Sequence, residues 1–309
     1  MIRVENLTKY YGKRLAVDNI SFNVKRGEIV GLLGPNAAGK TTTMRILTGF
    51  LAPTRGEVWI TDCNMLTQSL EARRHIGYLP ESVPLYTDMT VRSYLDFLAR
   101  LRGVAPDKLK NRINDVIETC HLEEYADVFI GRLSKGFRQR VGVAQAIIHE
   151  PDVLILDEPT IGIDPIQVTM TRQLIRELGK EHTVILSTHI LPEVSAICER
   201  VIIIHEGKIV AEDRIENLSS LLAGSRRIRL EIEGPSKKIA ECLRQVKGVT
   251  RVSYHDPHYT VEYPASLDLR GKITEAIARS GFTLLTLETV TMNLEDIFLK
   301  LTTAEETKQ

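Results

Sequence analysis

The sequence predicts an α/β fold with a buried, largely parallel sheet, followed by a smaller α+β domain. Three observations support this prediction: apolar β-branched runs alternate with helical patterns up to about residue 215, two amphipathic patterns interrupt them, and the pattern changes near residue 220. The runs expected as strands are GEIVGLLG (27–34), EVWIT (57–61), DVLILDEP (152–159), HTVILSTH (182–189) and RVIIIHEGKIVAE (200–212). Continuous apolar strands separated by helices are typical of a parallel sheet covered on both faces.

The two amphipathic patterns are TVRSYLDFLARLRG (90–103) and LKNRINDVIETCHL (109–122). Each carries apolar residues at steps of three and four, which places them on one face of a helix. They predict a helical subdomain, over about 87–150, that is inserted into the α/β domain.

The first domain is expected to span residues 1–220 and the second 221–309. RRIRLEIEG (226–234) alternates apolar and polar residues, as a half-exposed strand does. The elements expected after it are a helix through 239–246, strands TRVSYHD (250–256) and HYTVEYP (258–264), a helix over 268–280, a strand TLLTLETV (283–290) and a helix NLEDIFLKL (293–301). The order β-α-β-β-α-β is that of a ferredoxin-like domain. The tail TAEETKQ (303–309) is expected to be disordered.

Composition excludes several classes of protein. Lys plus Arg equals Asp plus Glu at 40 each, so no overall charge recruits nucleic acid or an anionic membrane surface. No apolar run is long enough to span a bilayer, and the N-terminus lacks the apolar core of a signal peptide. The four cysteines form no Cys-x-x-Cys pair, which favours reduced thiols in the cytoplasm over disulfides or a zinc site.

A phosphate-binding loop is indicated by GPNAAGKTT, in which Gly34 and Gly39-Lys40-Thr41 follow a strand and precede a helical pattern. Glycines let backbone N–H groups close round phosphate oxygens, and the helix N-terminus adds partial positive charge. The residues expected to bind the nucleotide here are Gly34, Pro35, Asn36, Ala37, Ala38, Gly39, Lys40, Thr41 and Thr42. Lys40 is expected to reach the β- and γ-phosphates and the Thr41 hydroxyl to ligate Mg²⁺. The alternative is a glycine-rich turn that binds nothing.

A carboxylate site is indicated by VLILDEPT, in which Asp157 and Glu158 follow a buried strand. Ligands of open parallel sheets bind at the carboxyl ends of the strands. Asp157 suits the Mg²⁺ shell and Glu158 suits a general base for the attacking water. Alone, an Asp-Glu pair after a strand is more often a solvated turn. His189 ends the next strand, so it is expected at the same edge, where it could sense the γ-phosphate and orient water.

These residues together resemble the nucleotide-binding subunit of an ATP-binding cassette (ABC) transporter. The likeness covers residues 1 to about 215 and rests on GPNAAGKTT, LSKGFRQRVGVAQAIIHEPDVLILDEPT, IGIDP and STH, in the family's order. It implies a P-loop NTPase fold with MgATP bound and hydrolysed.

The resemblance also implies that the site is shared between two chains. LSKGF (133–137) matches the family's signature motif, so Ser134 and Gly136 are expected to contact ATP that is held by a second ATPase subunit, in a homodimer. Tyr11 matches the aromatic that stacks on adenine, although Tyr10 beside it leaves the choice open. Asp164 matches the loop that links the two sites.

The chain departs from the family pattern at four positions. Glu81 stands where Gln is usual, and as a metal contact it would add a charge. Ala37 replaces a common Gly, so its φ is expected to be negative or only mildly strained. Lys135 and Phe137 replace Gly and Gln. Lys135 would add a cation facing the partner's triphosphate, unless both side chains point away and Phe137 packs in the helical subdomain.

The function expected from this resemblance is an ATP-binding and hydrolysing subunit that drives a separate multi-span membrane permease. YLPE, LSKGFRQR and NLEDIFLKL resemble the branch of multidrug, gliding-motility and polysaccharide exporters with ABC-2 type permeases. The chain is expected in the cytoplasm, on the inner face of the cell membrane, and in contact with the membrane only through the permease. A soluble ABC ATPase of translation or DNA repair is the alternative, although the chain has one cassette and no sustained heptads. A regulatory protein with a dead ATP site is disfavoured, because Lys40, Asp157, Glu158 and His189 are all present.

Overall fold

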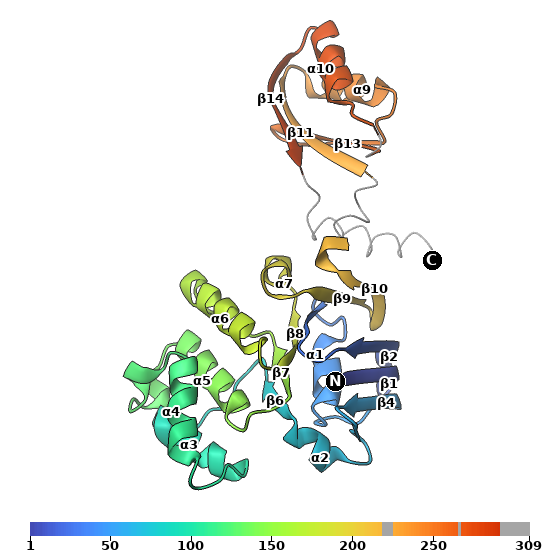
Figure 1. Ribbon diagram of the computed structural model, residues 1–309. Helices are drawn as coiled ribbons and strands as arrows, with labels where there is room; N and C mark the ends of the chain where they lie inside the picture. The colour runs from blue at the N-terminus through green and yellow to red at the C-terminus, as the bar shows by residue number, and fades with distance from the viewer. Residues whose placement is uncertain (218–224, 265–266, 291–309) are drawn as a thin grey trace. The chain divides into compact units, whose positions relative to one another are not determined.

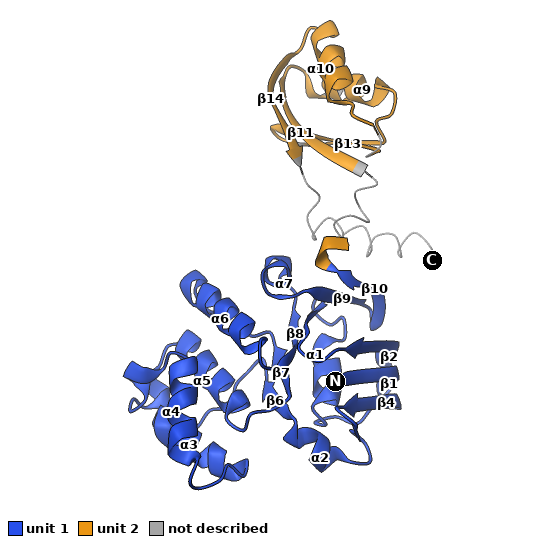
Figure 2. Ribbon diagram, viewed as in Figure 1, with its two compact units in different colours: residues 1–214 blue, residues 215–309 orange. Residues whose placement is uncertain are grey.

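The computed structural model describes residues 1–217, 225–264 and 267–290, which fall into two compact units (Figure 2). The first unit is Met1–Arg214 and the second is Ile215–Gln309. The predicted boundary near residue 220 lies outside the described residues. Within the described residues, no helix is both long and apolar enough to cross a membrane.

A six-stranded sheet forms the centre of the first unit (Figure 1). Its strand order is β10-β9-β3-β8-β7-β6, parallel throughout except for the antiparallel edge strand β10. The strands are β3 (Ile29–Leu33), β6 (Ile76–Leu79), β7 (Val153–Asp157), β8 (Thr183–Thr188), β9 (Arg200–His205) and β10 (Lys208–Arg214). Every residue of β3, β7 and β8 is buried, as the continuous apolar runs predict for a sheet covered on both faces. The single run 200–212 is a hairpin that turns at Glu206 and Gly207, both with positive φ.

A second, antiparallel sheet has the order β2-β1-β4-β5 and corrects the prediction for EVWIT. Its strands are β1 (Ile2–Tyr11), β2 (Arg14–Val24), β4 (Arg55–Ile60) and β5 (Cys63–Asn64). In β4, Val58 and Ile60 are buried while Glu57 is exposed. That alternation is the pattern of a half-covered antiparallel strand, so the prediction of a parallel-sheet strand at 57–61 is wrong. Strands β1 and β2 were not predicted.

Helix α1 (Lys40–Leu47) packs between the two sheets and completes their shared core (Figure 1). Its Met44, Ile46 and Leu47 are fully buried among side chains from both sheets. The other helices of the α/β part are α2 (Ser69–Arg74), α6 (Pro165–Leu178) and α7 (Leu191–Ile197). Because α1 starts at the end of β3, its first turn lies at the carboxyl edge of the parallel sheet.

The helical subdomain contains α3 (Val91–Leu101), α4 (Leu109–Thr119) and α5 (Lys135–Ile147), which pack against one another. The two predicted amphipathic helices are confirmed as α3 and α4. Thr90 caps α3 by accepting a hydrogen bond from Ser93 N at 3.2 Å. The apolar face of α4 is buried, as its spacing indicates. Helix α3 buries Val91, Tyr94, Leu95 and Ala99, whereas Phe97 and Leu101 remain exposed.

The second unit has the element order β-α-β-β-α-β within its described residues. Its elements are β11 (Ser225–Glu233), α9 (Ser236–Gln245), β12 (Arg251–His255), β13 (His258–Pro264), α10 (Arg270–Arg279) and β14 (Thr283–Val290). The sheet order β12-β13-β11-β14 is that of a ferredoxin-like fold, with both helices on one face (Figure 1). The core contains Ile228, Leu230 and Ile232 from alternate positions of β11. The predicted last helix at 293–301 and the tail at 303–309 lie outside the described residues.

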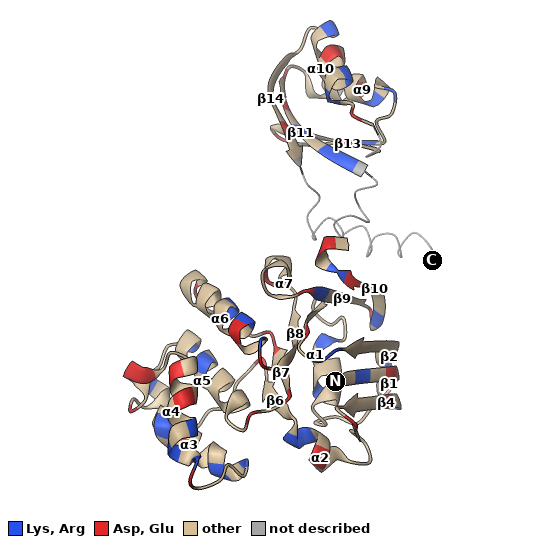
Figure 3. Ribbon diagram, viewed as in Figure 1, with Lys and Arg blue, Asp and Glu red and all other residues tan. Residues whose placement is uncertain are grey.

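Charges of both signs occur on both units (Figure 3), in line with the balanced composition. The described residues contain no group of three or more His, Cys, Asp or Glu side chains placed to hold a metal ion. In the stretch HDPH (255–258), Asp256 and Pro257 form the turn between β12 and β13, and the peptide bond between them is cis.

Candidate nucleotide site

The loop between β3 and α1 is shaped by glycines that no other residue could replace without strain. A Cβ at Gly34 would lie 2.2 Å from the carbonyl oxygen of Ile204. Gly39, which precedes α1, has φ +107°, and a Cβ there would lie 2.6 Å from Ala16 O. The spacing of the two glycines therefore reflects close backbone packing and a left-handed turn. The turn leads directly into the first N–H groups of α1, which have no partner within the helix.

Lys40 lies at the start of α1, and only 5% of its surface is exposed. Its Nζ donates hydrogen bonds to Gly34 O at 2.8 Å and Pro35 O at 3.1 Å. The same Nζ lies 3.5 Å from Glu158 Oε1. The buried ammonium thus has two backbone carbonyls and one carboxylate as partners. Phosphate oxygens, which are stronger acceptors for an ammonium group than carbonyls, can replace the carbonyls.

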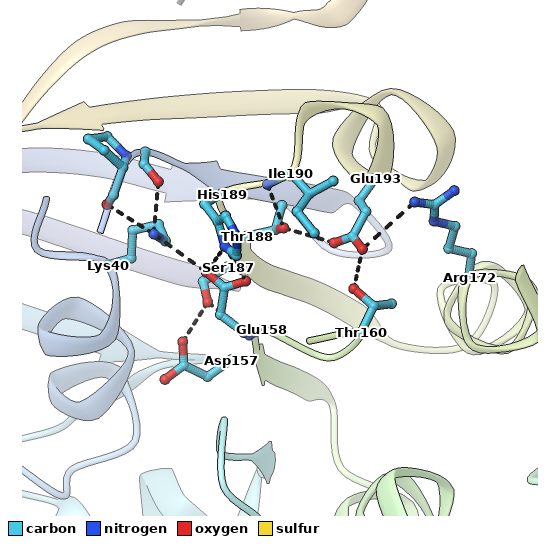
Figure 4. Close-up of polar contacts among 12 residues, drawn as sticks. Lys40, Asp157, Glu158, Thr160, Arg172, Ser187, Thr188, His189, Ile190 and Glu193 are labelled. Atoms are coloured by element: carbon cyan, nitrogen blue, oxygen red, sulfur yellow. Dashed lines mark hydrogen bonds and ion pairs between the residues drawn. The ribbon is translucent and has the colours of Figure 1, made fainter. Parts of the chain in front are cut away.

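Glu158 connects the phosphate loop to the end of β8 (Figure 4). Its carboxylate oxygens lie 3.0 and 3.1 Å from His189 Nδ1. Its backbone is in the left-handed region, with φ 50°, and its N–H points at both Ser187 Oγ and Ser187 O at 3.1 Å. The predicted meeting of Glu158 and His189 at one sheet edge is therefore present as a direct contact.

Asp157 is 1% exposed and accepts a hydrogen bond from Ser187 Oγ at 2.5 Å (Figure 4). Burial raises the pKa of the Asp157 carboxyl above its usual value. The Ser187 hydrogen bond opposes that rise, and the negative charges of Glu81 and Glu158 add to it. The ionised form of a buried carboxylate is destabilised when two other carboxylates lie nearby. A cation bound beside them would offset that repulsion and stabilise the ionised form.

A cleft of about 700 Å³ opens over these groups. It is lined by Tyr11, Arg14, Ala16, Asn36, Ala37, Gly39, Lys40, Thr41, Thr42, Glu81, Glu158, Ile161, Gly162, His189 and Ile190. Ten of the predicted site residues are in that set: Tyr11, Asn36, Ala37, Gly39, Lys40, Thr41, Thr42, Glu81, Glu158 and His189. Gly34, Pro35, Ala38 and Asp157 support the cleft without lining it. Of the two neighbouring tyrosines, Tyr11 lines the cleft and Tyr10 does not.

Ala37 has φ 65°, so of the two expected alternatives the negative value is wrong and the strained, left-handed conformation is the one present. A non-glycine residue in the left-handed region costs about 1–2 kcal/mol. The loop accommodates this strain because it is held on both sides, by Ala38 N bonded to Pro35 O at 3.2 Å and by Gly207 N bonded to Ala38 O at 3.0 Å.

Ser134 and Gly136 stand at the start of α5 and do not line the cleft of their own chain. Ser134 caps the helix by accepting a hydrogen bond from Phe137 N at 3.4 Å, and it is exposed. Gly136 is buried against α6, since a Cβ there would lie 2.8 Å from Gln167 Cγ. This helix start therefore has its own cap and lies outside the cleft that contains Lys40 and Glu158. Its Lys135 lines a separate cleft of about 440 Å³.

The two departures beside Gly136 have different surroundings. Lys135 lies against the loop after Glu158, because a Cβ at Gly162 would be 2.3 Å from Lys135 Nζ. Phe137 packs in the helical subdomain, with its ring centroid 4.0 Å from that of Tyr125. Asp164 ends the same loop and caps α6 by accepting a hydrogen bond from Gln167 N at 3.0 Å.

Sequence reasoning missed three side chains that shape this edge of the sheet. Arg14 lines the cleft from β2, a strand that was not predicted. Ser187 bridges Asp157 and Glu158, and Glu193 bonds both Thr160 and Thr188. The sequence signal for Ser187 is its place in the STH motif, two residues before the predicted His189, and Glu193 has no local signal.

The site combines a lysine on a glycine-rich loop after β3, a histidine after the neighbouring strand β8 and an Asp-Glu pair at the end of β7, the strand beyond it. Together these features define a P-loop ATPase. The protein-family model described as "ABC transporter" matches residues 17–161. Relatives at least 32% identical over almost the whole chain extend this match, and the protein belongs to the ABC transporter ATP-binding subunits.

The relatives include the bacitracin transport ATP-binding protein BcrA of Bacillus licheniformis, 35% identical over 97% of this chain and 97% of the relative. The linearmycin resistance ATP-binding protein LnrL of Bacillus subtilis is 32% identical over 98% of each chain. The Nod factor export ATP-binding protein I of Burkholderia thailandensis is 35% identical over 98% of this chain and 97% of the relative. These full-length matches include the second unit.

Among solved structures, an ATP-binding subunit of an ABC transporter matches with a TM-score of 0.66 and 29% identity, over 72% of this chain and 93% of that one. The bacterial cassette MJ0796, solved as a dimer, matches with a TM-score of 0.63 and 27% identity over 69% and 98% of the chains. A second structure of MJ0796 is of a post-hydrolysis state with ADP and Pi. The protein is thus an ATP-binding and hydrolysing subunit of an ABC transporter, and the soluble, non-transport alternative has no support.

Proposed function

We propose that this subunit powers export through a separate multi-span permease, and that Lys40, Glu158 and His189 perform the central steps of ATP hydrolysis. The observation that supports this most is their direct contact in one cleft: Lys40 Nζ lies 3.5 Å and His189 Nδ1 lies 3.0 Å from the Glu158 carboxylate. Export is the activity printed in the name of the Nod factor relative, and transport or resistance in those of the others.

Binding of ATP begins with exchange of partners at Lys40. Its ammonium leaves the carbonyls of Gly34 and Pro35 and takes phosphate oxygens, which carry full negative charge. The loop amides and the N-terminus of α1 hold the remaining oxygens. Tyr11, half-exposed at the cleft, supplies a ring on which the adenine stacks.

Hydrolysis uses Glu158 as the general base. Its carboxylate accepts a proton from the water that attacks the γ-phosphorus, and the bond from that phosphorus to the β-γ bridging oxygen breaks. His189 holds Glu158 through Nδ1, which leaves Nε2 to contact the γ-phosphate or the water. The charge of Lys40 stabilises the negative charge on the transferred group.

We assign Mg²⁺ to Thr41, Asp157 and Glu81. Thr41 and Glu81 line the cleft, and the buried Asp157 has the raised pKa of a carboxyl that gains from a nearby cation. All three supply hard oxygen donors, and Mg²⁺ in such sites is held by one or two carboxylates together with substrate phosphates. When bound there, the ion would neutralise negative charge on the β- and γ-phosphates.

A second copy of the chain completes each site. Ser134 and Gly136 lie at a helix start outside their own chain's cleft, and Ser134 is exposed. Facing another copy, this helix start presents N–H groups and partial positive charge to the γ-phosphate. MJ0796, a structural neighbour, is a dimer, which supports the same assembly for this chain.

The permease is proposed to dock in a second cleft of about 400 Å³ on the first unit. Its lining residues are Arg45, Phe50, Tyr78, Pro80, Glu81, Ser82, Pro84, Arg102, Gln145 and Asp157. Phe50 is 77% exposed at this cleft, which suits contact with an apolar segment of another protein. Glu81 lines both clefts, so a segment bound here can respond to nucleotide. This contact would hold the subunit on the inner face of the cell membrane.

The permease contact is tested by purifying the tagged chain from detergent-solubilised membranes of its host. We expect a multi-span membrane protein to be recovered with the parent chain and to be lost with Phe50→Asp. Leu66→Asp, a matched change at a 51% exposed leucine outside that cleft, should keep the partner. Recovery with ribosomes or nucleic acid, and none with membranes, would contradict the proposal.

A further inference from the structure

Glu193 is a buried carboxylate near the site to which neither the resemblance nor the cleft geometry assigns a role in the reaction. It lies in the first turn of α7 and is 1% exposed (Figure 4). Its Oε1 accepts a hydrogen bond from Thr160 Oγ1, and its Oε2 accepts one from Thr188 Oγ1 at 2.8 Å. Arg172 NH2 on α6 lies 3.7 Å from Oε1 and balances its charge.

The two threonines stand at positions that matter for the reaction. Thr160 is two residues after Glu158, and Thr188 is the residue before His189. Both are buried, at 3% and 0% exposure. The Thr188 hydroxyl also accepts a hydrogen bond from Ile190 N at 3.0 Å, so it links the residues immediately before and after His189. One carboxylate therefore fixes the chain after the general base and the chain around the histidine.

The cost of this arrangement argues for a role beyond packing. A buried carboxylate pays a desolvation penalty, and an apolar residue of similar size would fill the same space at lower cost. Glu158 is held in the left-handed region, with φ 50°, where a non-glycine residue is strained. Among the polar contacts drawn in Figure 4, the chain after β7 is joined to the end of β8 in three ways. These are the contact of 3.0 Å between Glu158 and His189, the hydrogen bonds of Ser187, and the hydrogen bonds of Glu193.

We propose that Glu193 is a positioning residue that holds His189 against Glu158 by accepting hydrogen bonds from Thr160 and Thr188. The inference rests on the proposed roles of Glu158 and His189. Arg172 extends the link to α6, whose first turn is capped by Asp164 at the end of the loop after Glu158. A displacement of that loop would reach His189 through Thr160 and Glu193.

The test compares Glu193→Gln, His189→Ala and the double variant in single-turnover ATP hydrolysis, with MgATP affinity measured in parallel. Glu193→Gln should lower the hydrolysis rate about 10- to 100-fold and leave ATP affinity within about 2-fold, because misplacement affects the chemical step. The double variant should be no slower than His189→Ala alone, since residues that act as a unit are not additive. Glu199→Gln, at an exposed position just after α7, is the matched control and should keep the parental rate.

Two changes at Thr160 give a second test: valine keeps the shape of the side chain without the hydroxyl, and serine keeps the hydroxyl without the methyl group. Thr160→Val should lower the rate, and Thr160→Ser, which keeps the donor, should restore it. The proposal is wrong if Glu193→Gln keeps the parental rate, if it weakens ATP binding as much as hydrolysis, if its effect adds to that of His189→Ala, or if Thr160→Val and Thr160→Ser behave alike. A parental rate for His189→Ala would instead show that the role given to His189 is itself wrong.

Discussion

Two helix starts in the first unit carry the residues expected to contact phosphate, and their surroundings differ. The start of α1 is enclosed: Gly39 is in a left-handed conformation, Lys40 is buried, and a cleft opens above them. The start of α5 is open: Ser134 is exposed and lines no cleft with those residues. We call the start of α1 with its cleft the enclosed half of the site, and the start of α5 the open half. Under the proposed function, catalysis needs both halves, brought together from two copies of the chain.

The largest effect is expected from Glu158→Gln, which tests whether chemistry belongs to the enclosed half. The amide keeps the shape of the side chain and cannot accept a proton from water, so kcat should fall about 10²- to 10⁴-fold. ATP affinity should be retained, and a dimer should accumulate with MgATP, as seen by size-exclusion chromatography. A parental rate of hydrolysis would remove Glu158 from the role of base.

Lys40→Ala should weaken ATP binding to a single chain about 10- to 100-fold, because it removes a charge-assisted contact to phosphate from a buried position. Titration of MgATP by calorimetry measures this. Lys180→Ala, at an exposed position after α6, serves as the control and should bind as the parent does. Unchanged affinity of Lys40→Ala would contradict the assignment of the loop.

Ser134→Asp should separate the two halves, since aspartate caps a helix as well as serine does and adds a charge that repels phosphate. We expect the single chain to bind ATP with parental affinity. Hydrolysis should fall about 10-fold or more, because the aspartate of one copy repels the triphosphate bound by the other. Ser134→Asn keeps the cap without the charge and should lie closer to the parent. Equal rates for the aspartate and asparagine variants would argue against a nearby triphosphate.

The smallest effect concerns the stability of the fold, which the buried Asp157 of the enclosed half is expected to lower. Burial raises the pKa of folded Asp157, so the folded state binds that proton more tightly than the unfolded chain, and stability is lost as pH rises through this range. Without Mg²⁺ at pH 7, Asp157→Asn should therefore increase the free energy of unfolding by about 0.5–2 kcal/mol.

Urea unfolding in EDTA measures the difference, which should shrink as the pH is lowered toward about 4. Asp115→Asn, at an exposed position of α4, should change little at either pH. If the Asp157→Asn variant without Mg²⁺ were less stable than the parent at pH 7, the ionised carboxylate would not destabilise the folded state.

Local features of the sequence predicted the enclosed half well. The spacing of Gly34, Gly39 and Lys40 encodes close backbone packing, and the carboxyl ends of neighbouring strands brought Glu158 and His189 together as expected. The ferredoxin-like element order also followed from alternating and helical periodicities.

What the sequence did not predict depends on contacts between distant segments. Strands β1 and β2 were missed, because paired strands with irregular register lack a clean alternation. Glu193 bonds Thr160 only because α7 follows β8 at the edge where β7 also ends. The positive φ of Ala37 is imposed by the bonded loop around it, and Lys135 lies on Gly162 because α5 packs against the start of α6.

The most direct test of the shared site is to mix two impaired variants, Lys40→Ala and Ser134→Asp, and to measure steady-state ATP hydrolysis. In a mixed dimer one site pairs the intact loop of the Ser134→Asp chain with the intact helix start of the Lys40→Ala chain. We predict that the mixture hydrolyses ATP several-fold faster than either variant alone at the same total protein concentration. A mixture no faster than the average of its two components would contradict a site built from two copies.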